Sequence, residues 1–108
     1  MSAVATRLDK LLALQKSDPA DPELMYMIAL ELSKADQHAD AVRWLDQALG
    51  LNAKFYYAYY QKGKSLAAAG DLPAARAALL AGLDYAKKYN QTKAAGELAA
   101  LLADLKSA

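Results

Sequence analysis

The sequence contains no cysteine and very little valine or isoleucine. Without cysteine the chain forms no disulfide and offers neither a thiol nucleophile nor a thiolate metal ligand. Because β-branched residues favour strands, their scarcity argues against a sheet, whereas the abundant alanine is the strongest helix former. These absences predict an all-α fold.

The chain also lacks an excess of one charge and any long hydrophobic run. The sequence has thirteen basic and twelve acidic residues and no polybasic segment. It therefore lacks the positively charged surface that binds nucleic acid or an anionic membrane. No apolar stretch approaches the ~20 residues that span a bilayer, and the N-terminus does not follow the pattern of a secretory signal. We therefore expect a single cytoplasmic domain, residues 1–108, with no nucleic-acid or membrane partner.

Catalytic and metal-binding groups are scarce as well. His38 is the single histidine, and without cysteines or clustered carboxylates it cannot build a metal site, so we interpret it as a solvent-facing turn residue. Ser33 lies nearby but alone offers no nucleophilic triad. No glycine-rich phosphate loop is present. The sequence predicts no enzyme, no cofactor and no metal site, with an enzyme or small-ligand protein left open as an alternative.

Helix boundaries recur at short intervals along the chain. Asp21 can cap a helix whose first residue is Pro22, and Gly70 marks a helix end. Asp36 is expected to end a helix in the left-handed conformation, as Gly70 does, and Asn52 to end another in the same way. Apolar residues recur with helical spacing between these positions, and the short connections require consecutive helices to pack antiparallel. Six helices are predicted, over residues 4–17, 22–35, 38–51, 55–69, 72–88 and 92–106.

A repeat relates the two central parts of the chain. Shifting the sequence by 34 residues lays 22–55 onto 56–89 without a gap. The matches fall on the apolar helical positions and both segments break at the same offset, which a composition rich in Ala and Leu does not explain. The identical pairs include Tyr26 with Tyr60, Leu32 with Leu66, Ala35 with Ala69, Ala41 with Ala75, Leu45 with Leu79 and Leu49 with Leu83.

A helix-turn-helix unit of this length resembles the tetratricopeptide repeat family, and the large and small residues follow that family's pattern. Met25 and Tyr59 occupy its large apolar position early in the first helix, and Ala29 and Gly63 its small position four residues later. Small residues let two helix backbones approach, and large ones fill the gaps. The resemblance implies a right-handed array of antiparallel helix pairs. Its parts would be a partial repeat at 4–17, complete repeats at 22–55 and 56–89, and a C-terminal capping helix at 92–106.

Aromatic residues crowd into the segment KFYYAYYQKG, residues 54–63, which holds five of the eight Phe and Tyr residues. Tyr59 replaces Met25 and is expected to be buried, and Phe55 and Tyr56 to pack at the turn between repeats. In tetratricopeptide arrays another face of each first helix lines a concave groove where peptides or partner helices dock. The resemblance therefore implies a protein-interaction module that binds a protein or peptide partner. The predicted lining is Tyr26, Leu30, Tyr57, Tyr60 and Lys64, with Glu23 and Lys34 toward the rim.

Two alternatives stand beside this hypothesis. The tyrosines can serve only to cover the core, and a short array can expose apolar terminal helix faces, which predicts homo-oligomerisation or an assembly subunit. The family also contains clamps for a terminal carboxylate, but Tyr26 and Leu30 occupy the leading clamp positions here and donate no charge-assisted hydrogen bond. We therefore do not expect carboxylate binding of that kind. For Trp44, core burial is favoured over a role as an interface anchor.

Overall fold

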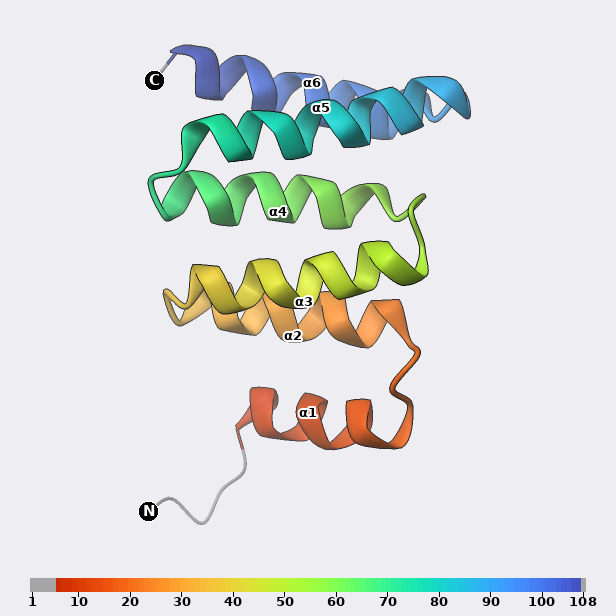
Figure 1. The fold of residues 1–108 in the computed structure, drawn as a ribbon, viewed down its shortest axis with the longest axis vertical. Helices are drawn as coiled ribbons and strands as arrows, with labels where there is room; N and C mark the ends of the chain where they lie inside the picture. The colour runs from red at the N-terminus through yellow and green to blue at the C-terminus, as the bar shows by residue number, and fades with distance from the viewer. Residues whose placement is uncertain (1–5, 108) are drawn as a thin grey trace.

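The computed structural model describes residues 6–107, which form six α-helices and no strand (Figure 1). The all-α prediction is confirmed, and each helix lies within a few residues of its expected place. Residues 4 and 5, where the first helix was expected to begin, lie outside the described residues. The helices are α1 (Arg7–Ser17), α2 (Pro22–Lys34), α3 (His38–Leu51), α4 (Tyr56–Ala68), α5 (Leu72–Lys88) and α6 (Thr92–Ser107).

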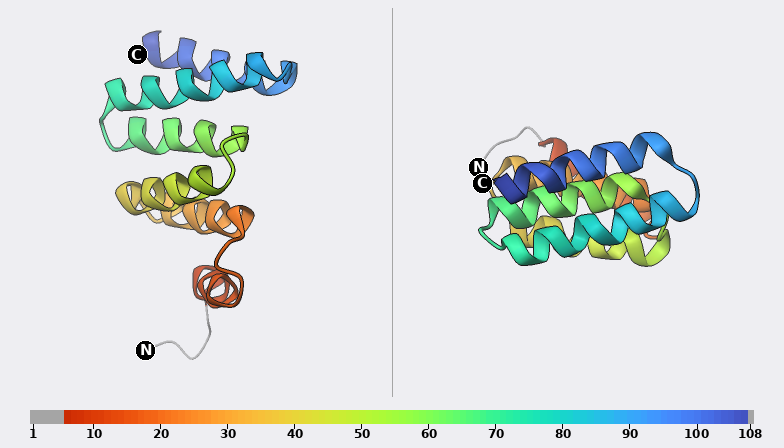
Figure 2. Two further views of the ribbon diagram at one scale, coloured as in Figure 1. Left: turned by 45° about the vertical axis from the view of Figure 1, so that its right-hand side comes forward. Right: turned by 90° about the horizontal axis from the view of Figure 1, so that it is seen from above.

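The helices stack in antiparallel order along the long axis of the molecule, as Figures 1 and 2 show. Each helix packs against the next one in sequence. In addition α2 contacts α4 and α4 contacts α6, whereas α1, α3 and α5 make no contact with one another within residues 6–107. We call the row formed by α2, α4 and α6 the inner row.

Side chains near the first turn fix three of the helix starts. Thr6 and Asp9 form a capping box before α1: the Asp9 N–H donates to the Thr6 hydroxyl at 3.1 Å, and the Thr6 N–H donates to the Asp9 carboxylate at 3.2 Å. This box starts α1 directly after Thr6, later than predicted. The Asp21 carboxylate caps α2 by accepting from the Glu23 N–H at 2.9 Å, and Asp71 caps α5 in the same manner.

The turns inside the two central helix pairs have the same backbone, 34 residues apart. Asp36 adopts a φ of 60° and Gly70 a φ of 88°, the left-handed conformation that the sequence predicts for both. In both turns the next N–H donates to the carbonyl five residues earlier, at 2.9 Å. Asn90, with a φ of 57°, forms a third turn of this type between α5 and α6. The pairs α2–α3 and α4–α5 therefore share the same turn geometry.

The turns between the pairs are of another type, and the prediction for Asn52 is wrong. Asn52 ends α3 in an extended conformation with a φ of −145°. Its side-chain oxygen accepts the Lys54 N–H at 3.0 Å and its carbonyl accepts the Phe55 N–H at 3.1 Å, so the turn closes without a left-handed residue. Asp18 accepts the equivalent backbone bond from Asp21, 34 residues earlier.

The core consists of two clusters of buried apolar side chains. One joins α1, α2, α3 and the start of α4, and the other joins α4, α5 and α6. Leu45 and Leu79, related by the 34-residue shift, are each completely buried, one in each cluster. Trp44 is half-buried against the first cluster, in agreement with the sequence prediction. The burial pattern thus repeats along with the turns.

Helices α4 and α5 approach closely because glycine stands at two of their contact points. A Cβ on Gly63 would lie 2.5 Å from the Leu79 side chain, and a Cβ on Gly82 would lie 2.6 Å from the Tyr59 Cβ. At such short distances a side chain at either position would force Leu79 or Tyr59 to shift. The prediction that these small residues permit close helix packing is confirmed.

Candidate functional site

The aromatic segment 55–60 is divided between the interior and the surface. Tyr59 is only 8% exposed, as predicted, while Tyr57 on another face of α4 is 40% exposed. Phe55 packs against the first core cluster and Tyr56 against the second, so both residues pack at the turn between the pairs. Tyr57 is therefore the most accessible aromatic side chain of this segment.

Tyr59 is a core residue with a satisfied hydroxyl. The hydroxyl donates to the Ala53 carbonyl at 2.8 Å, and the ring stacks on Tyr85 with centroids 6.0 Å apart. Burial raises the pKa of Tyr59 above its ordinary value of 10.0, and the neighbouring hydroxyls of Tyr85 and Tyr56 raise this pKa further. Its role is packing between α4 and α5.

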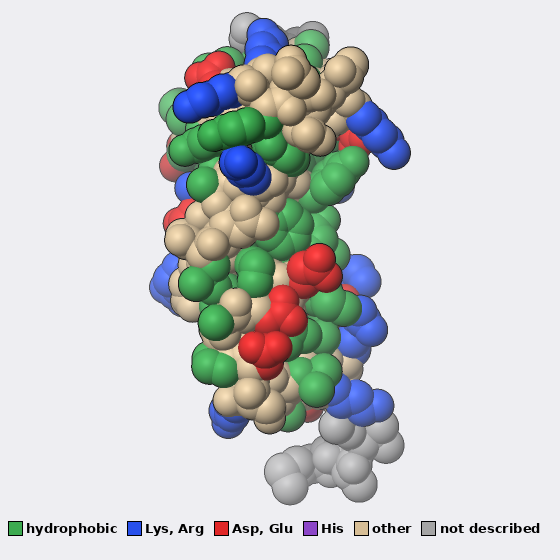
Figure 3. Space-filling model, turned by 90° about the vertical axis from the view of Figure 1, so that its right-hand side faces the viewer, with side chains coloured by type: hydrophobic (Ala, Val, Ile, Leu, Met, Phe, Trp, Pro, Cys, Tyr) green, Lys and Arg blue, Asp and Glu red, His purple; other side chains and the backbone are tan. Residues whose placement is uncertain are grey.

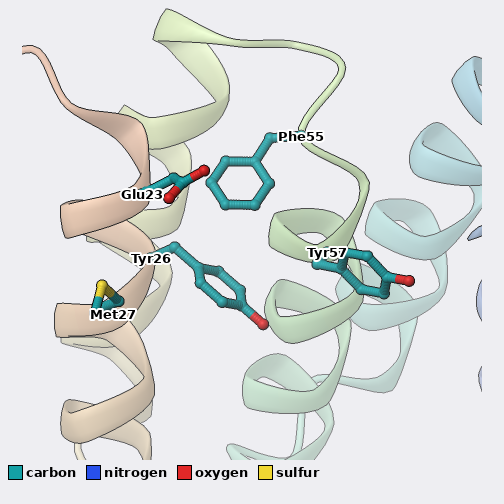
Figure 4. Close-up of a pocket in the computed structure, with 5 residues that line it drawn as sticks. All are labelled: Glu23, Tyr26, Met27, Phe55 and Tyr57. Atoms are coloured by element: carbon teal, nitrogen blue, oxygen red, sulfur yellow. The ribbon is translucent and has the colours of Figure 1, made fainter.

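A pocket of about 320 Å³ opens between α2 and the start of α4. Its walls combine three aromatic rings, one thioether and one carboxylate. In Figure 4 the Glu23 carboxylate and the Phe55 ring lie next to each other, the Tyr26 ring reaches toward α4, and the Tyr57 ring projects from α4. The lining residues are Glu23, Tyr26, Met27, Phe55 and Tyr57.

Contacts from three helices hold the rings of the pocket in place. Tyr26 and Phe55 lie against each other with centroids 5.1 Å apart and planes tilted by 42°. The Tyr57 hydroxyl donates to the Glu97 carboxylate at 3.2 Å, which connects α4 with α6. Burial, followed by the nearby Tyr57 hydroxyl, raises the pKa of Tyr26 above 10.0, so Tyr26 stays neutral at physiological pH.

The structure brings two of the five predicted lining residues, Tyr26 and Tyr57, into this pocket. Tyr60 is half-buried against the second core cluster, and the Lys64 ammonium lies 5.9 Å from the centroid of its ring. Leu30 is half-buried on α2, one turn beyond Tyr26 and outside the pocket lining. We call the pocket together with Leu30, Tyr60 and Lys64 the inner surface.

Three residues at or beside the pocket were not predicted as its lining. Met27 and Phe55 line the pocket and Glu97 contacts Tyr57. Met27 directly follows the predicted lining residue Tyr26 on an amphipathic helix, and this position was a sequence signal that could have indicated it. Glu97 gave none, because the 34-residue shift places it on the buried Gly63 and α6 follows a different register.

Charge is distributed unevenly around the pocket. Glu23 is exposed and belongs to no ion pair of the described side chains, whereas Glu31 pairs with Arg7 at 3.5 Å and with Lys34 at 3.0 Å. Figure 3 views the end of the molecule where α2, α4 and α6 begin and shows acidic groups among hydrophobic side chains in its lower half. The pocket thus carries a carboxylate that no cation of the described chain neutralises.

The prediction of a solvent-facing His38 is wrong, because a polar network holds the imidazole at a junction of helices. The side chain is only 18% exposed, and Nδ1 lies 3.2 Å from the Ser33 hydroxyl. Ser33 also faces the Ser65 hydroxyl at 3.2 Å and accepts from the Gln61 amide at 3.4 Å. Side chains of α2, α3 and α4 meet in this network, so no local pattern in the sequence could reveal it.

The same network includes the residue types of a hydrolytic triad, since Asp36 lies 3.6 Å from Nε2 of His38. However, the Ser33 hydroxyl is engaged with the fully buried Ser65 and with Gln61, and Asp36 is 95% exposed. The bonds satisfy polar groups that the junction would otherwise bury without partners, and no buried side-chain nitrogen or oxygen of the described residues is unpaired. We therefore interpret the network as structural.

A second open pocket lies on the other flank, where α3 and α5 do not touch. Its volume is about 370 Å³, and four of its eight lining residues are alanine. Lys62 at its edge pairs with Asp46 across the helices at 2.7 Å, which places the lysine ammonium outside the apolar interior. The lining residues are Val42, Tyr59, Lys62, Leu66, Ala74, Ala77, Ala78 and Ala81.

The described residues contain neither a metal-binding cluster nor a membrane-spanning helix. Within that part of the chain, no group of three or more His, Cys, Asp or Glu side chains is placed to hold a metal ion. None of the six helices there has the length and apolar character that crossing a bilayer requires. We take the pocket on the inner row, which three aromatic rings line, as the candidate site.

The fold has a counterpart among solved structures. The solution structure of a structural-genomics target protein from Bordetella parapertussis matches with a TM-score of 0.83, over 96% of this chain and 90% of that chain, at 23% sequence identity. At this identity the match shows the fold alone. No protein-family model matches the chain, and the comparison with curated proteins finds no match.

Proposed function

We propose that the protein is a non-enzymatic interaction module of the tetratricopeptide type, which binds a peptide or a helix of a partner protein on its inner surface. The observation that carries the proposal is the open aromatic pocket, to which Tyr26 of one helix pair and Tyr57 of the next both contribute. A ligand in this pocket would contact both pairs at once. A cytoplasmic location is part of the same proposal.

The packing of the helices supports a concave flank on this side. Neighbouring helices of the inner row touch each other, whereas α3 and α5 on the opposite flank, within residues 6–107, do not. A stack that is closely packed on one side and open on the other curves toward the packed side. Helical-repeat proteins use such concave surfaces to bind extended partners.

The side chains on the inner surface suit recognition. Tyrosine offers a large rigid contact area with few rotatable bonds and a hydroxyl that can exchange hydrogen bonds with a ligand. Tyr57 remains 40% exposed although its hydroxyl is already held by Glu97, so its ring is fixed in position before any ligand arrives. Preorganised side chains lose less entropy on binding.

The repeated geometry supports the assignment to this class. Left-handed residues at Asp36 and Gly70, and fully buried leucines at Leu45 and Leu79, recur at the same 34-residue interval. The hairpins α2–α3 and α4–α5 have the same local geometry and stack side by side. Equivalent positions of α2 and α4 therefore lie along the same flank.

The test compares the removal of two tyrosines that are equally exposed. A peptide is first selected from a random display library against the intact chain, and its dissociation constant is measured by calorimetry. Tyr57→Ala should weaken binding about tenfold or more, because a central aromatic contact is lost. Tyr89→Ala is the matched control, since Tyr89 is 37% exposed against 40% for Tyr57 but lies at the end of α5.

The control variant should bind as the wild type does, and both variants should keep the wild-type helical circular dichroism. Equal affinity of the Tyr57→Ala variant and the wild type, with the fold intact, would count against the proposed binding surface.

A further inference from the structure

The pocket on the inner row combines aromatic rings with a single carboxylate. We propose that it receives a cationic side chain, the lysine or arginine of a bound peptide. This inference rests on the proposed function and specifies the chemistry of its ligand. It follows from three observations on the described residues. The rings of the pocket have no described lysine or arginine over them, the Glu23 carboxylate forms no ion pair with a described side chain, and the pocket has the size of one long side chain.

The rings of the pocket are the first observation. The face of an aromatic ring attracts a cation. The chain already uses this attraction elsewhere, since Lys54 lies 3.8 Å from the centroid of Tyr89 and Lys64 lies 5.9 Å from that of Tyr60. Among the described side chains, no lysine or arginine is placed over Tyr26, Phe55 or Tyr57. No described cation therefore competes for these rings, and Tyr57 is the most exposed of the three.

The second observation is the carboxylate of Glu23. It lines the pocket and points toward the Phe55 ring in Figure 4. It forms no ion pair with any described side chain, and Lys54, which precedes the pocket residue Phe55 in the sequence, lies over the Tyr89 ring instead. The Glu97 carboxylate accepts a hydrogen bond from the Tyr57 hydroxyl and adds a second negative charge beyond the Tyr57 ring. An incoming cation would meet favourable potential from both sides.

The size and lining of the pocket are the third observation. A volume of about 320 Å³ lies at the small end of the usual range for ligand sites and accommodates one long side chain. The methylene stem of a lysine or arginine would lie against Met27 and the rings while its charged end reaches Glu23. An apolar anchor would bury the Glu23 carboxylate without a partner, and an acidic one would be repelled by it. The lining therefore favours a cation over both.

The test uses a pair of probes of nearly equal shape. N-acetyl-arginine amide carries the positive charge, and N-acetyl-citrulline amide replaces the guanidinium by a neutral urea. Each probe is titrated into the isotopically labelled intact chain, and dissociation constants are taken from the resonances of Tyr26, Phe55 and Tyr57. The arginine probe should bind roughly threefold more tightly or better, and added salt should reduce the difference.

Two variants separate the effect of the pocket from that of overall charge. Glu23→Gln should bring the two probes to equal affinity, because it removes the charge and keeps the shape. Glu31→Gln removes the same charge from the same helix outside the pocket and should leave the arginine preference intact.

Equal affinity for both probes in the wild type overturns the inference, and so does a preference that survives Glu23→Gln. A failure of the arginine probe to shift the pocket resonances at tens of millimolar overturns it as well. The proposed function is judged separately, since the loss of binding in Tyr57→Ala does not depend on the charge of the ligand.

Discussion

Two tyrosines of α4 that are two positions apart have different roles, because helical geometry directs their side chains to different faces. Tyr59 points between α4 and α5, where its ring meets Gly82 and its hydroxyl is bound to the Ala53 carbonyl. Tyr57, two positions earlier, points along the inner row and reaches Glu97 on α6. One short segment thus supplies both a packing residue and an exposed ring.

The buried tyrosines make the stability of the fold sensitive to alkaline pH. The pKa values of Tyr26 and Tyr59 are raised above 10.0 in the folded chain, so the folded state holds these protons more tightly than the unfolded state. Their contribution is fully present below pH 10.0 and is lost as the pH rises through the folded pKa values. The free energy of unfolding should therefore fall as the pH rises from about 9 to about 11.

Urea unfolding across this range, with the Tyr59→Phe variant beside the wild type, checks the expectation. The variant should be less stable at neutral pH by about 0.5–1.5 kcal/mol, because the bond to the Ala53 carbonyl is lost. It should also lose stability less steeply above pH 10. Parallel pH curves for the two proteins would contradict the account of Tyr59.

Single residues were predictable where a repeat partner existed. The burial of Tyr59 follows from its alignment with Met25, which is 4% exposed. His38 was not predictable, because its contact with Ser33 belongs to a network that Ser65 and Gln61 of another helix complete. Polar networks of this kind depend on tertiary packing and leave no periodic signal in the sequence.

At the scale of helices, the contact between α4 and α5 depends on two glycines. Gly63 stands against Leu79 and Gly82 against Tyr59, so each helix contributes one glycine to the contact. Glycine inside a helix costs roughly 0.5–1 kcal/mol relative to alanine. The closer packing offsets this cost at both positions.

Gly82→Ala should therefore destabilise the protein by about 1–3 kcal/mol, because the added methyl group collides with Tyr59. Gly96→Ala is the matched control, since Gly96 lies within α6 and an added Cβ there meets no atom within 4 Å. This control should stabilise the protein by about 0.5–1 kcal/mol. Thermal unfolding of both variants gives the two values, and a neutral Gly82→Ala would show that α4 and α5 can separate at little cost.

Helix boundaries were predictable where proline, aspartate or glycine marks them. Asp21 and Gly70 took the expected roles because cap and turn geometry depends on these residues themselves. Asn52 can either adopt the left-handed conformation or bond the following backbone, and the sequence does not show which. The start of α1 is fixed by the capping box of Thr6 and Asp9, so this helix begins later than predicted.

At the scale of the whole molecule, the two ends of the stack differ. The face that α6 turns to solvent consists of small or charged residues, such as Gly96, Ala100 and Asp104, which is typical of a terminal helix in a repeat array. At the other end α1 leaves Leu14 55% exposed. Homo-oligomerisation through a terminal face stays a prediction, and α1 is the end with the larger exposed apolar side chain.

The all-α architecture was predictable because composition, helical spacing and the 34-residue repeat agree. The candidate site was predictable only in part. Tyr26 was predicted from its alignment with Tyr60, and Tyr57 from the helical face that it shares with Tyr60, three residues later. The path of Tyr57 to Glu97 depends on how α6 packs, and α6 does not share the register of the repeats. Contacts between a repeat and its terminal helix therefore required the structure.

The central claim is that the inner surface binds the partner. A chemical-shift map of the intact chain with a selected peptide tests it most directly. Binding on the inner surface predicts that the perturbed amides lie on α2, α4 and α6, centred on Tyr26 and Tyr57. Perturbation centred instead on the alanine-lined pocket between α3 and α5, around Val42 and Ala77, would contradict the claim.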